Sequence, residues 1–293
     1  GTPRPSPTVS PSPSPTMTPK SSPSARPSDT PVPETPTQAP TDAELGNVRV
    51  TVTELVLQTY GYEAAFLETE PGDPVYPYPR LDPEKVMPPQ PRSYRAIVLE
   101  NDYVALMILP ELGGRIYRWV DKATGRRLLY ENPVIKPTGW GYRGWWLAAG
   151  GIEWAFPVEE HGLNEWRPWS YVVNRSNESV SITVSDVEDR TGMTVGVDIT
   201  LGARRDYVRF SPWVKNTSDV AQAFQYWLNA MVTLGDNHVA GRTRLIFPTG
   251  EVIVHSTGDA SLPGEWQPMP WPIYGGRDLS RYESWESYLG CFA

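Results

Sequence analysis

Hydrophobic and polar residues alternate along most of the chain from about residue 48 onwards. β-Branched and aromatic residues are frequent in these runs, and no helical period persists over a dozen positions. Turn-forming residues separate the runs by about ten residues between positions 171 and 216, which is typical of a large antiparallel sandwich. We therefore predict strands at residues 48–57, 94–100, 103–109, 115–120, 128–130, 171–173, 179–187, 191–201, 207–216, 224–234, 244–248 and 251–255.

Two stretches depart from this alternation. Residues 132–169 hold six tryptophans among several glycines, with little regular period. Long stretches without secondary structure are uncommon in compact domains and usually carry function, so we expect an irregular loop that forms the binding face. Residues 71–91 are rich in Pro, Asp and Tyr and are predicted to form a strap over the surface.

The tryptophan-rich stretch contains a carboxylate and an imidazole close together in sequence, Glu153 and His161. A carboxylate between tryptophans can lose its solvation, which raises its pKa toward the range of a general acid. We predict that Glu153 and His161 form a catalytic acid–base pair. The structural alternative is that Glu153 accepts hydrogen bonds from the backbone of the glycine-rich loop and that His161 is a solvent-facing turn residue.

The many aromatic side chains have two explanations. Their rings stack on the C–H faces of sugars, and the same rings fill the cores of sandwiches. Tryptophans among glycines and prolines, Trp140 included, are the better candidates for a sugar platform, whereas those in strand patterns are expected in the core. The predicted substrate-binding residues are the aromatic Trp146, Trp154, Trp166 and Trp271 and the polar Arg115, Asn229 and His238.

The sequence offers no cofactor or metal motif. It has no loop with calcium-ligand spacing and no histidine pair with ligand spacing, and its one cysteine cannot build a zinc site. Glycine loops that cradle phosphates are missing as well, which disfavours nucleotide-dependent enzymes. No metal and no cofactor are therefore predicted.

The N-terminal region differs in composition from the rest of the chain. Residues 1–41 hold 13 of the 32 prolines, with 8 serines, 8 threonines and no aromatic residue. Such a segment cannot bury enough apolar surface to offset its chain entropy. We predict a disordered Pro/Ser/Thr-rich linker over residues 1–43 and a folded domain over residues 44–293. A spacer of this kind fits an extracellular or cell-surface protein that is tethered through its N-terminal tail.

Charge and hydropathy exclude two classes of partner. The formal net charge is −8, so there is no excess of cations to displace the counterions of nucleic acid. No run of about 18 apolar residues occurs, so no transmembrane segment is expected. The predicted partner is a saccharide or polysaccharide.

Several ordered motifs resemble one bacterial family. They are residues 100–103 (ENDY), 109–117 (LPELGGRIY), 121–125 (DKATG), 131–137 (ENPVIKP), 150–157 (GGIEWAFP), 189–193 (DRTGM) and 227–230 (WLNA). From about residue 48 to the end, the chain resembles the domain-of-unknown-function family 5107. The resemblance implies a galactose-mutarotase-like antiparallel β-supersandwich, in which a concave sheet presents a sugar-binding face. It implies no particular reaction.

The chemistry of the wider mutarotase superfamily carries over only in part. The resemblance implies a histidine acid two residues before a Tyr-Phe pair, together with a carboxylate base. The comparable pair here is Tyr226-Trp227, and Phe224 stands where the histidine is expected, which is a departure from the pattern for aldose mutarotation. The resemblance also implies further strands after Ala293, so we expect residues 291–293 to be an interrupted strand and the domain to be C-terminally truncated.

Three functions fit these residues, and we favour them in the following order. The first is a carbohydrate-active domain of the epimerase, lyase or glycoside hydrolase class, in which Glu153 and His161 exchange protons with a bound sugar. The second is a noncatalytic carbohydrate-binding module with the same aromatic platform. The third is a structural or adhesion domain on a stalk, in which the aromatic residues all belong to the core.

Overall fold

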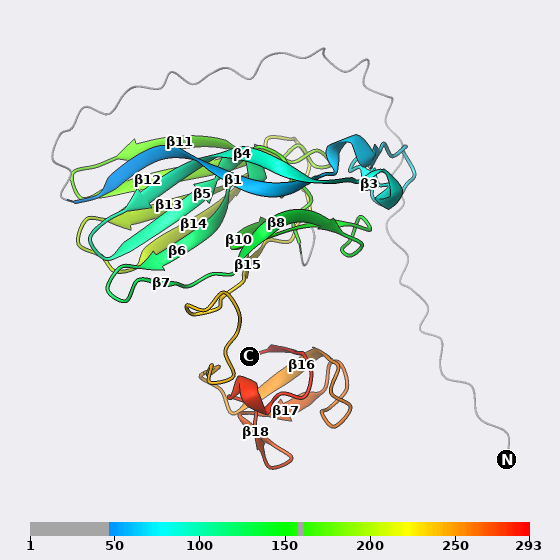
Figure 1. Cartoon of the computed structure of the whole chain (residues 1–293). Coiled ribbons are helices and arrows are strands. Elements are labelled where there is room, and N and C mark those ends of the chain that lie inside the picture. Colours follow the sequence, from blue (N-terminus) through cyan, green and yellow to red (C-terminus); the bar gives the residue numbers. More distant parts are fainter. Residues whose placement is uncertain (1–46, 158–160) are drawn as a thin grey trace. The chain divides into compact units, whose positions relative to one another are not determined.

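The structure is a computed structural model that describes residues 47–157 and 161–293. The predicted linker over residues 1–43 lies outside the described residues. The described chain is mostly β, as the alternating pattern predicts, with short 3-10 turns between strands (Figure 1). No helix in these two ranges is long and apolar enough to cross a membrane.

The largest sheet, called the large sheet below, has nine strands within the described residues. Its order is β15-β10-β6-β5-β4-β1-β8-β9, with β7 paired to β6. Neighbours are antiparallel except for a short parallel contact between β1 and β8. The strands are β1 (Arg49–Gly61), β4 (Met87–Glu100), β5 (Val104–Leu109), β6 (Arg115–Asp121), β7 (Arg126–Arg127), β8 (Glu131–Thr138), β9 (Trp146–Gly150), β10 (Ile152–Ala155) and β15 (Trp227–Ala230).

The small sheet is the meander that the turn spacing predicts. Its strands follow the chain order β11-β12-β13-β14 and are antiparallel throughout. Their observed bounds lie within a few residues of the predicted ones, which confirms this part of the sequence prediction. They are β11 (Ser170–Arg175), β12 (Ser179–Val187), β13 (Thr194–Gly202) and β14 (Val208–Lys215).

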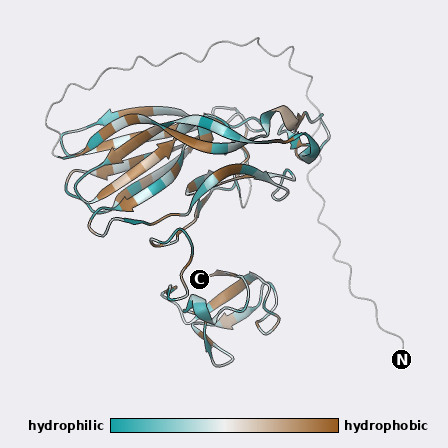
Figure 2. Cartoon of the chain, in the orientation of Figure 1, coloured by the Kyte–Doolittle hydropathy of each residue, from teal (hydrophilic) through white to brown (hydrophobic). Residues whose placement is uncertain are grey.

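The two sheets share one hydrophobic core. Ile97 and Leu106 of the large sheet belong to the same buried cluster as Val184 and Val197 of the small sheet. Each of these side chains is at most 1% exposed, and full burial of one such side chain contributes about 1.5–3 kcal/mol. Figure 2 shows hydrophobic and hydrophilic residues alternating along the strands, so one face of each strand supplies this core.

Asn101 joins the turns of the two sheets. Its Oδ1 accepts hydrogen bonds from the backbone N–H groups of Tyr103 and Val104, both at 2.9 Å, which closes the turn between β4 and β5. Its Nδ2 donates to the carbonyl oxygens of Gly202 at 2.8 Å and Arg205 at 2.7 Å in the turn after β13. This turn falls between the predicted strands 94–100 and 103–109, and its asparagine also links the two layers.

A strap precedes β4 and covers a second hydrophobic cluster. The strap contains the 3-10 turns η1 (Glu63–Ala65) and η2 (Pro83–Lys85) and the short strands β2 (Phe66–Leu67) and β3 (Arg80–Leu81). Its Tyr62 belongs to this second cluster together with Tyr94 and Leu147 of the large sheet and with Trp145, which precedes β9. The predicted strap of residues 71–91 ends earlier than expected, because β4 already begins at Met87 and pairs with β1.

The strap is fastened to the small sheet by a buried carboxylate, Glu188. The hydroxyl of Tyr78 in the strap donates to Glu188 Oε1. Glu188 also accepts from the backbone N–H groups of Arg190 at 2.8 Å and Thr191 at 2.7 Å, so it closes the turn between β12 and β13 at the same time. The guanidinium of Arg190 lies 4.9 Å from the centre of the Tyr78 ring.

The C-terminal strands differ from the prediction. Residues 251–255 were expected to extend the sandwich, but β16 belongs to a separate three-stranded sheet within the described residues, with its own hydrophobic cluster. Residues 244–248 are not a strand, and β15 covers only part of the predicted strand 224–234. The remaining elements are β16 (Glu251–Thr257), β17 (Pro268–Pro270), β18 (Ile273–Tyr274), β19 (Arg277–Asp278), η3 (Pro110–Leu112), η4 (Tyr282–Ser284) and β20 (Leu289–Phe292).

The tryptophan-rich stretch is more regular than predicted. It contains β8, β9 and β10, and β9 and β10 are joined by the pair Gly150-Gly151, whose φ angles are 78° and 76°. A Cβ at Gly150 would overlap the carbonyl oxygen of Tyr130, and one at Gly151 would overlap that of Ile116. Only glycine allows this close backbone approach, which brings β10 against β6.

Gly151 provides a test of this packing. The Gly125 position in the β6–β7 turn is a matched control, because its φ is 69° and a Cβ there would meet no described atom within 4 Å. We expect Gly125→Ala to lower the free energy of unfolding by about 1–2 kcal/mol through the left-handed conformation alone. Gly151→Ala adds an overlap of its Cβ with the backbone and is expected to lower the free energy of unfolding by about 3 kcal/mol or more. Urea denaturation measures both, and equal losses would contradict the account.

Candidate functional site

Strand alternation in β10 brings Glu153 to the site. Ile152 and Trp154 point into the core between the sheets, so Glu153 points to the opposite face of the large sheet. Asn229 of β15 is its direct cross-strand partner, and its side chain therefore lies on the same face. Glu153 is nevertheless only 1% exposed, so its charge must be compensated by protein groups.

Among the described residues, four side chains surround the Glu153 carboxylate. Oε1 is hydrogen-bonded to His161 Nδ1 and accepts a hydrogen bond from Asn229 Nδ2 at 3.0 Å. Oε2 accepts a hydrogen bond from Trp146 Nε1 at 3.0 Å and lies 3.7 Å from Arg115 Nη2. Both oxygens are thus engaged by the protein.

Arg115 supplies a fixed positive charge behind Glu153. This first residue of β6 is fully buried, and it donates from Nε to the carbonyl oxygen of Leu112 at 3.1 Å and from Nη1 to that of Gly150 at 2.8 Å. Its Nη2 faces Glu153 but has no hydrogen-bond partner among the described residues. The Gly150-Gly151 turn therefore also anchors the guanidinium that compensates Glu153.

The His161 imidazole lies between two tryptophans. Its ring centre is 4.3 Å from that of Trp146, at an interplanar angle of 32°, and 5.0 Å from that of Trp140, in an edge-on arrangement. The His161 side chain is 18% exposed, and Trp140 is 53% exposed. Because Nδ1 is hydrogen-bonded to Glu153, Nε2 is the ring nitrogen that has no hydrogen-bond partner among the described residues. The structure thus presents an imidazole nitrogen beside an exposed indole.

The pKa of Glu153 differs from the sequence expectation. Burial alone would raise it, as predicted from the neighbouring tryptophans. The hydrogen bonds from His161 and Asn229 and the positive charge of Arg115 outweigh burial and hold the pKa of Glu153 below its ordinary value. The expectation of a raised pKa was wrong, because sequence spacing does not reveal these partners. An ionised Glu153 can only accept a hydrogen bond, so the proton of the contact with His161 lies on Nδ1, and Nε2 points away from Glu153.

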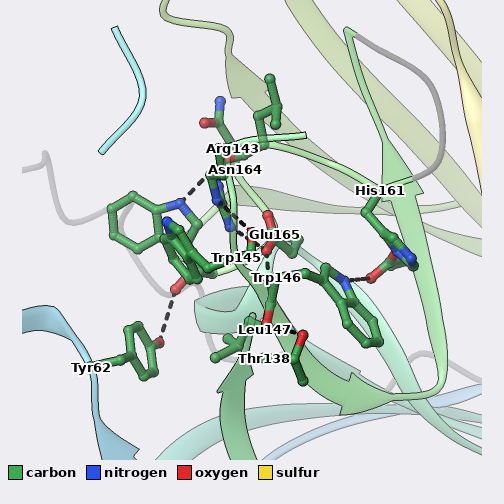
Figure 3. A network of polar contacts seen from close by, with 12 residues as sticks. Tyr62, Thr138, Arg143, Trp145, Trp146, Leu147, His161, Asn164 and Glu165 are labelled. Carbon is green, nitrogen blue, oxygen red and sulfur yellow. Dashed lines mark hydrogen bonds and ion pairs between the residues drawn. The ribbon is translucent and has the colours of Figure 1, made fainter. Parts of the chain in front are cut away.

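A second buried ion pair, Arg143 and Glu165, lies beside the site (Figure 3) and was not singled out from the sequence. Both side chains are 1% exposed. Arg143 donates to the carbonyl oxygens of Leu163 and Trp145, and Glu165 Oε1 accepts from the backbone N–H of Leu147 at 3.2 Å. Burial raises the pKa of Glu165, and the nearby Arg143 only partly opposes this. The available sequence signal was two charged residues inside an apolar, tryptophan-rich stretch.

The structure brings five of the predicted site residues together and leaves four elsewhere. The five are Glu153, His161, Arg115, Trp146 and Asn229. Of the others, Trp154 is 2% exposed in the core between the sheets, because it alternates with Glu153 along β10. Trp166 packs on Phe66 and Trp145 in the second cluster beneath the strap.

The remaining two predicted residues lie outside this group. His238 is exposed in a turn, where its Nδ1 is 2.8 Å from the carbonyl oxygen of Asp236. Trp271 is 7% exposed and packs on Phe247 in the C-terminal cluster. Position in a glycine- and proline-rich segment therefore did not distinguish exposed tryptophans from buried ones. Within residues 47–157 and 161–293 there is no group of three or more His, Cys, Asp or Glu side chains that could hold a metal ion.

Comparison with known proteins identifies the family. Residues 70–287 match the model of the domain of unknown function DUF5107. The chain belongs to the DUF5107 family. The crystal structure of a TPR-domain containing protein from Parabacteroides distasonis is similar, with a TM-score of 0.68 and 27% identity. The match covers 79% of this chain and 38% of that chain, so this DUF5107 chain spans less than half the length of that protein.

The lowered pKa of Glu153 makes the stability of this DUF5107 domain depend on pH. A carboxylate whose pKa is lowered by folding contributes stability above its ordinary value of 4.5, and this contribution is lost as the pH falls below that value. Glu153→Gln removes the charge that pairs with Arg115, so we expect it to lower the free energy of unfolding by about 3 kcal/mol near pH 7. The difference in the free energy of unfolding between Glu153→Gln and wild type should become smaller near pH 4.

Urea denaturation at the two pH values measures this narrowing. Glu286→Gln is the control, because the Glu286 side chain is 68% exposed. It should change the free energy of unfolding by less than about 0.5 kcal/mol at either pH. A difference between Glu153→Gln and wild type that stays constant, or grows, as the pH falls would show that Glu153 is not held ionised.

Proposed function

We propose that this DUF5107 domain is a galactose-mutarotase-like β-supersandwich that binds a saccharide beside His161. The observation that carries the proposal is the Glu153–His161 pair next to the exposed indole of Trp140. A sugar ring offers an apolar C–H face to an aromatic ring and hydroxyl groups to polar atoms at its edge. Trp140 supplies the first kind of contact, and His161 Nε2 supplies the second.

The chemistry that this arrangement supports best is proton transfer by His161. Glu153 fixes the ring through Nδ1 and stabilises the imidazolium that forms when Nε2 takes a proton, as the carboxylate does in other carboxylate–histidine pairs. Such a base can deprotonate a sugar hydroxyl or an acidic C–H group next to a carbonyl. Among the three reaction classes, epimerases and lyases need this step.

Hydrolysis by paired carboxylates fits the site less well. A glycoside hydrolase of the usual kind places two carboxyl groups on either side of the scissile bond. The side chains of Glu153 and Glu165 are both buried, and both accept hydrogen bonds from protein groups. Neither is placed to touch a bound sugar, so we favour acid–base chemistry by the histidine over glycoside hydrolysis.

A noncatalytic carbohydrate-binding module is the second candidate. The observation that favours it is the same burial of both carboxylates, because it leaves His161 as the one titratable group that we place against the ligand. Binding would then use Trp140 and His161 without turnover.

In either case we propose an extracellular or cell-surface location, with the domain tethered through its Pro/Ser/Thr-rich N-terminal tail, because such a tail acts as a spacer.

A glycan array followed by titration of intrinsic fluorescence tests binding. For the glycan that binds best, we expect Trp140→Ala to weaken the affinity roughly tenfold, through the loss of one stacking contact of about 1.4 kcal/mol. Trp266→Ala is the matched control, because Trp266 is 62% exposed but lies in the C-terminal sheet region. Equal effects of the two variants, or a flat response across a broad panel, would favour the structural or adhesion role instead.

Turnover separates the enzyme from the binding module. We expect His161→Gln to abolish turnover of a bound glycan, while binding is retained within about tenfold, because the general base is lost but the indole wall remains. His238→Gln is the control, since His238 is exposed and outside the site. Product analysis by mass spectrometry and NMR gives the measurement. Unchanged turnover in His161→Gln would remove His161 from the acid–base role.

A further inference from the structure

Two short segments of the chain build the aromatic wall of the site. Residues 143–147 carry Trp146, and residues 161–166 carry His161. Trp146 and His161 meet through their rings and through Glu153, to which both are bonded. Trp146 is held by strand pairing with Thr138 of β8, whereas residues 161–166 belong to no strand. Contacts between the two segments therefore help to set the position of His161.

The buried pair Arg143 and Glu165, called the clamp below, joins these two segments. Arg143 belongs to the first segment and donates to Glu165 and to the carbonyl oxygen of Leu163, both of the second. Glu165 accepts in return from the backbone N–H of Leu147 at 3.2 Å. Figure 3 shows the clamp and the pair Trp146–His161 as neighbouring parts of one polar network.

The clamp forms hydrogen bonds with the backbone on both sides of Trp146. Arg143 Nε donates to the carbonyl oxygen of Trp145 at 3.2 Å, and its guanidinium lies 3.7 Å from the centre of the Trp145 ring. Glu165 holds the N–H of Leu147. Because the backbone on either side of Trp146 is held, the Cβ atom that carries its indole is fixed relative to residues 163–165.

A contribution to the stability of the fold does not explain why these two buried residues are charged. Burying two charges costs several kcal/mol per ion, and apolar residues of similar volume are often as stabilising as a buried ion pair. Glu165 Oε2 even lacks a hydrogen-bond partner within the described part of the chain, so the pair is incompletely compensated. What the charged pair offers beyond apolar residues is a set of directional contacts to named backbone groups.

We infer that the Arg143–Glu165 clamp is a positioning element that holds the Trp146 indole against the His161 imidazole and so fixes the ring nitrogen that His161 presents. The inference deepens the proposed function, on which it rests for the role of His161. The clamp residues are buried and do not touch a ligand. Their effect reaches the site only through Trp146 and the segment that carries His161.

The tautomer of His161 reports this effect without any ligand. Long-range proton–nitrogen NMR of the full chain distinguishes Nδ1–H from Nε2–H in each of the three histidines, and His161→Gln assigns the His161 signals. We expect Arg143→Lys to shift the His161 ratio toward Nε2–H by roughly fivefold to tenfold, which corresponds to one hydrogen bond. Lysine keeps the charge but cannot reach Leu163, Trp145 and Glu165 together.

Two further variants complete the experiment. Glu165→Gln keeps an acceptor oxygen for Leu147 but weakens the contact with Arg143. It should therefore shift the His161 tautomer ratio in the same direction as Arg143→Lys, but by a smaller factor. If Arg143→Lys does not fold, Glu165→Gln alone tests the inference. Arg277→Lys is the matched control, because Arg277 pairs with the buried Asp259 at 2.7 Å in the C-terminal sheet region.

An unchanged His161 ratio in both folded clamp variants would overturn the inference, and so would an equal shift in Arg277→Lys. These outcomes are independent of the proposed function. If no glycan binds but the clamp variants shift the tautomer, the proposed function fails and the positioning role stands.

Discussion

The burial of the Glu153 carboxylate imposes the strictest requirement on this fold. A charge that is almost fully removed from water must be met by several donors and an opposite charge, or it would take up a proton. The protein meets it with His161, Asn229, Trp146 and Arg115, which come from four separate parts of the sequence. Much of the local architecture can be understood as the means of bringing these groups together.

Sheet register does most of this assembly. The order β15-β10-β6 places Asn229, Glu153 and Arg115 on neighbouring strands, and period-two alternation puts the first two on one face while Trp154 fills the core on the other. The Gly150-Gly151 turn then serves two purposes: it lets β10 approach β6, and its carbonyl group holds the guanidinium of Arg115. A slip of one residue in β10 would exchange Glu153 and Trp154 and destroy both the core and the site.

The sequence predicts the strand content and the pairing of residues that are close together, but not the contacts between distant segments. The meander from β11 to β14 follows from local alternation and turn spacing and is confirmed, and the turn that Asn101 closes falls between two predicted strands. Glu153 and His161 could be singled out because they lie close in sequence within an unusual segment. Asn229 and Arg115 were named as polar candidates, yet their contact with Glu153 depends on strand order, which alternation does not encode.

The errors have a common physical cause. Trp154, Trp166 and Trp271 were predicted as exposed platforms because glycines and prolines surround them, but burial depends on which elements pack nearby. The same limitation affected the pKa of Glu153: burial was anticipated, whereas the donors that outweigh it come from other strands. The Arg143–Glu165 pair was overlooked because charged residues are usually solvated, and only tertiary packing shows these two to be buried.

The central claim is that Glu153 orients His161 so that Nε2 faces a sugar beside Trp140. A crystal structure of the full chain with the saccharide that binds best on a glycan array tests it most directly. We expect a sugar hydroxyl, or the carbon that loses its proton, within about 3 Å of Nε2. We also expect that the C–H face of the ring lies on Trp140 and that Nδ1 remains bonded to Glu153. A saccharide bound elsewhere, with His161 facing only solvent, would contradict the claim.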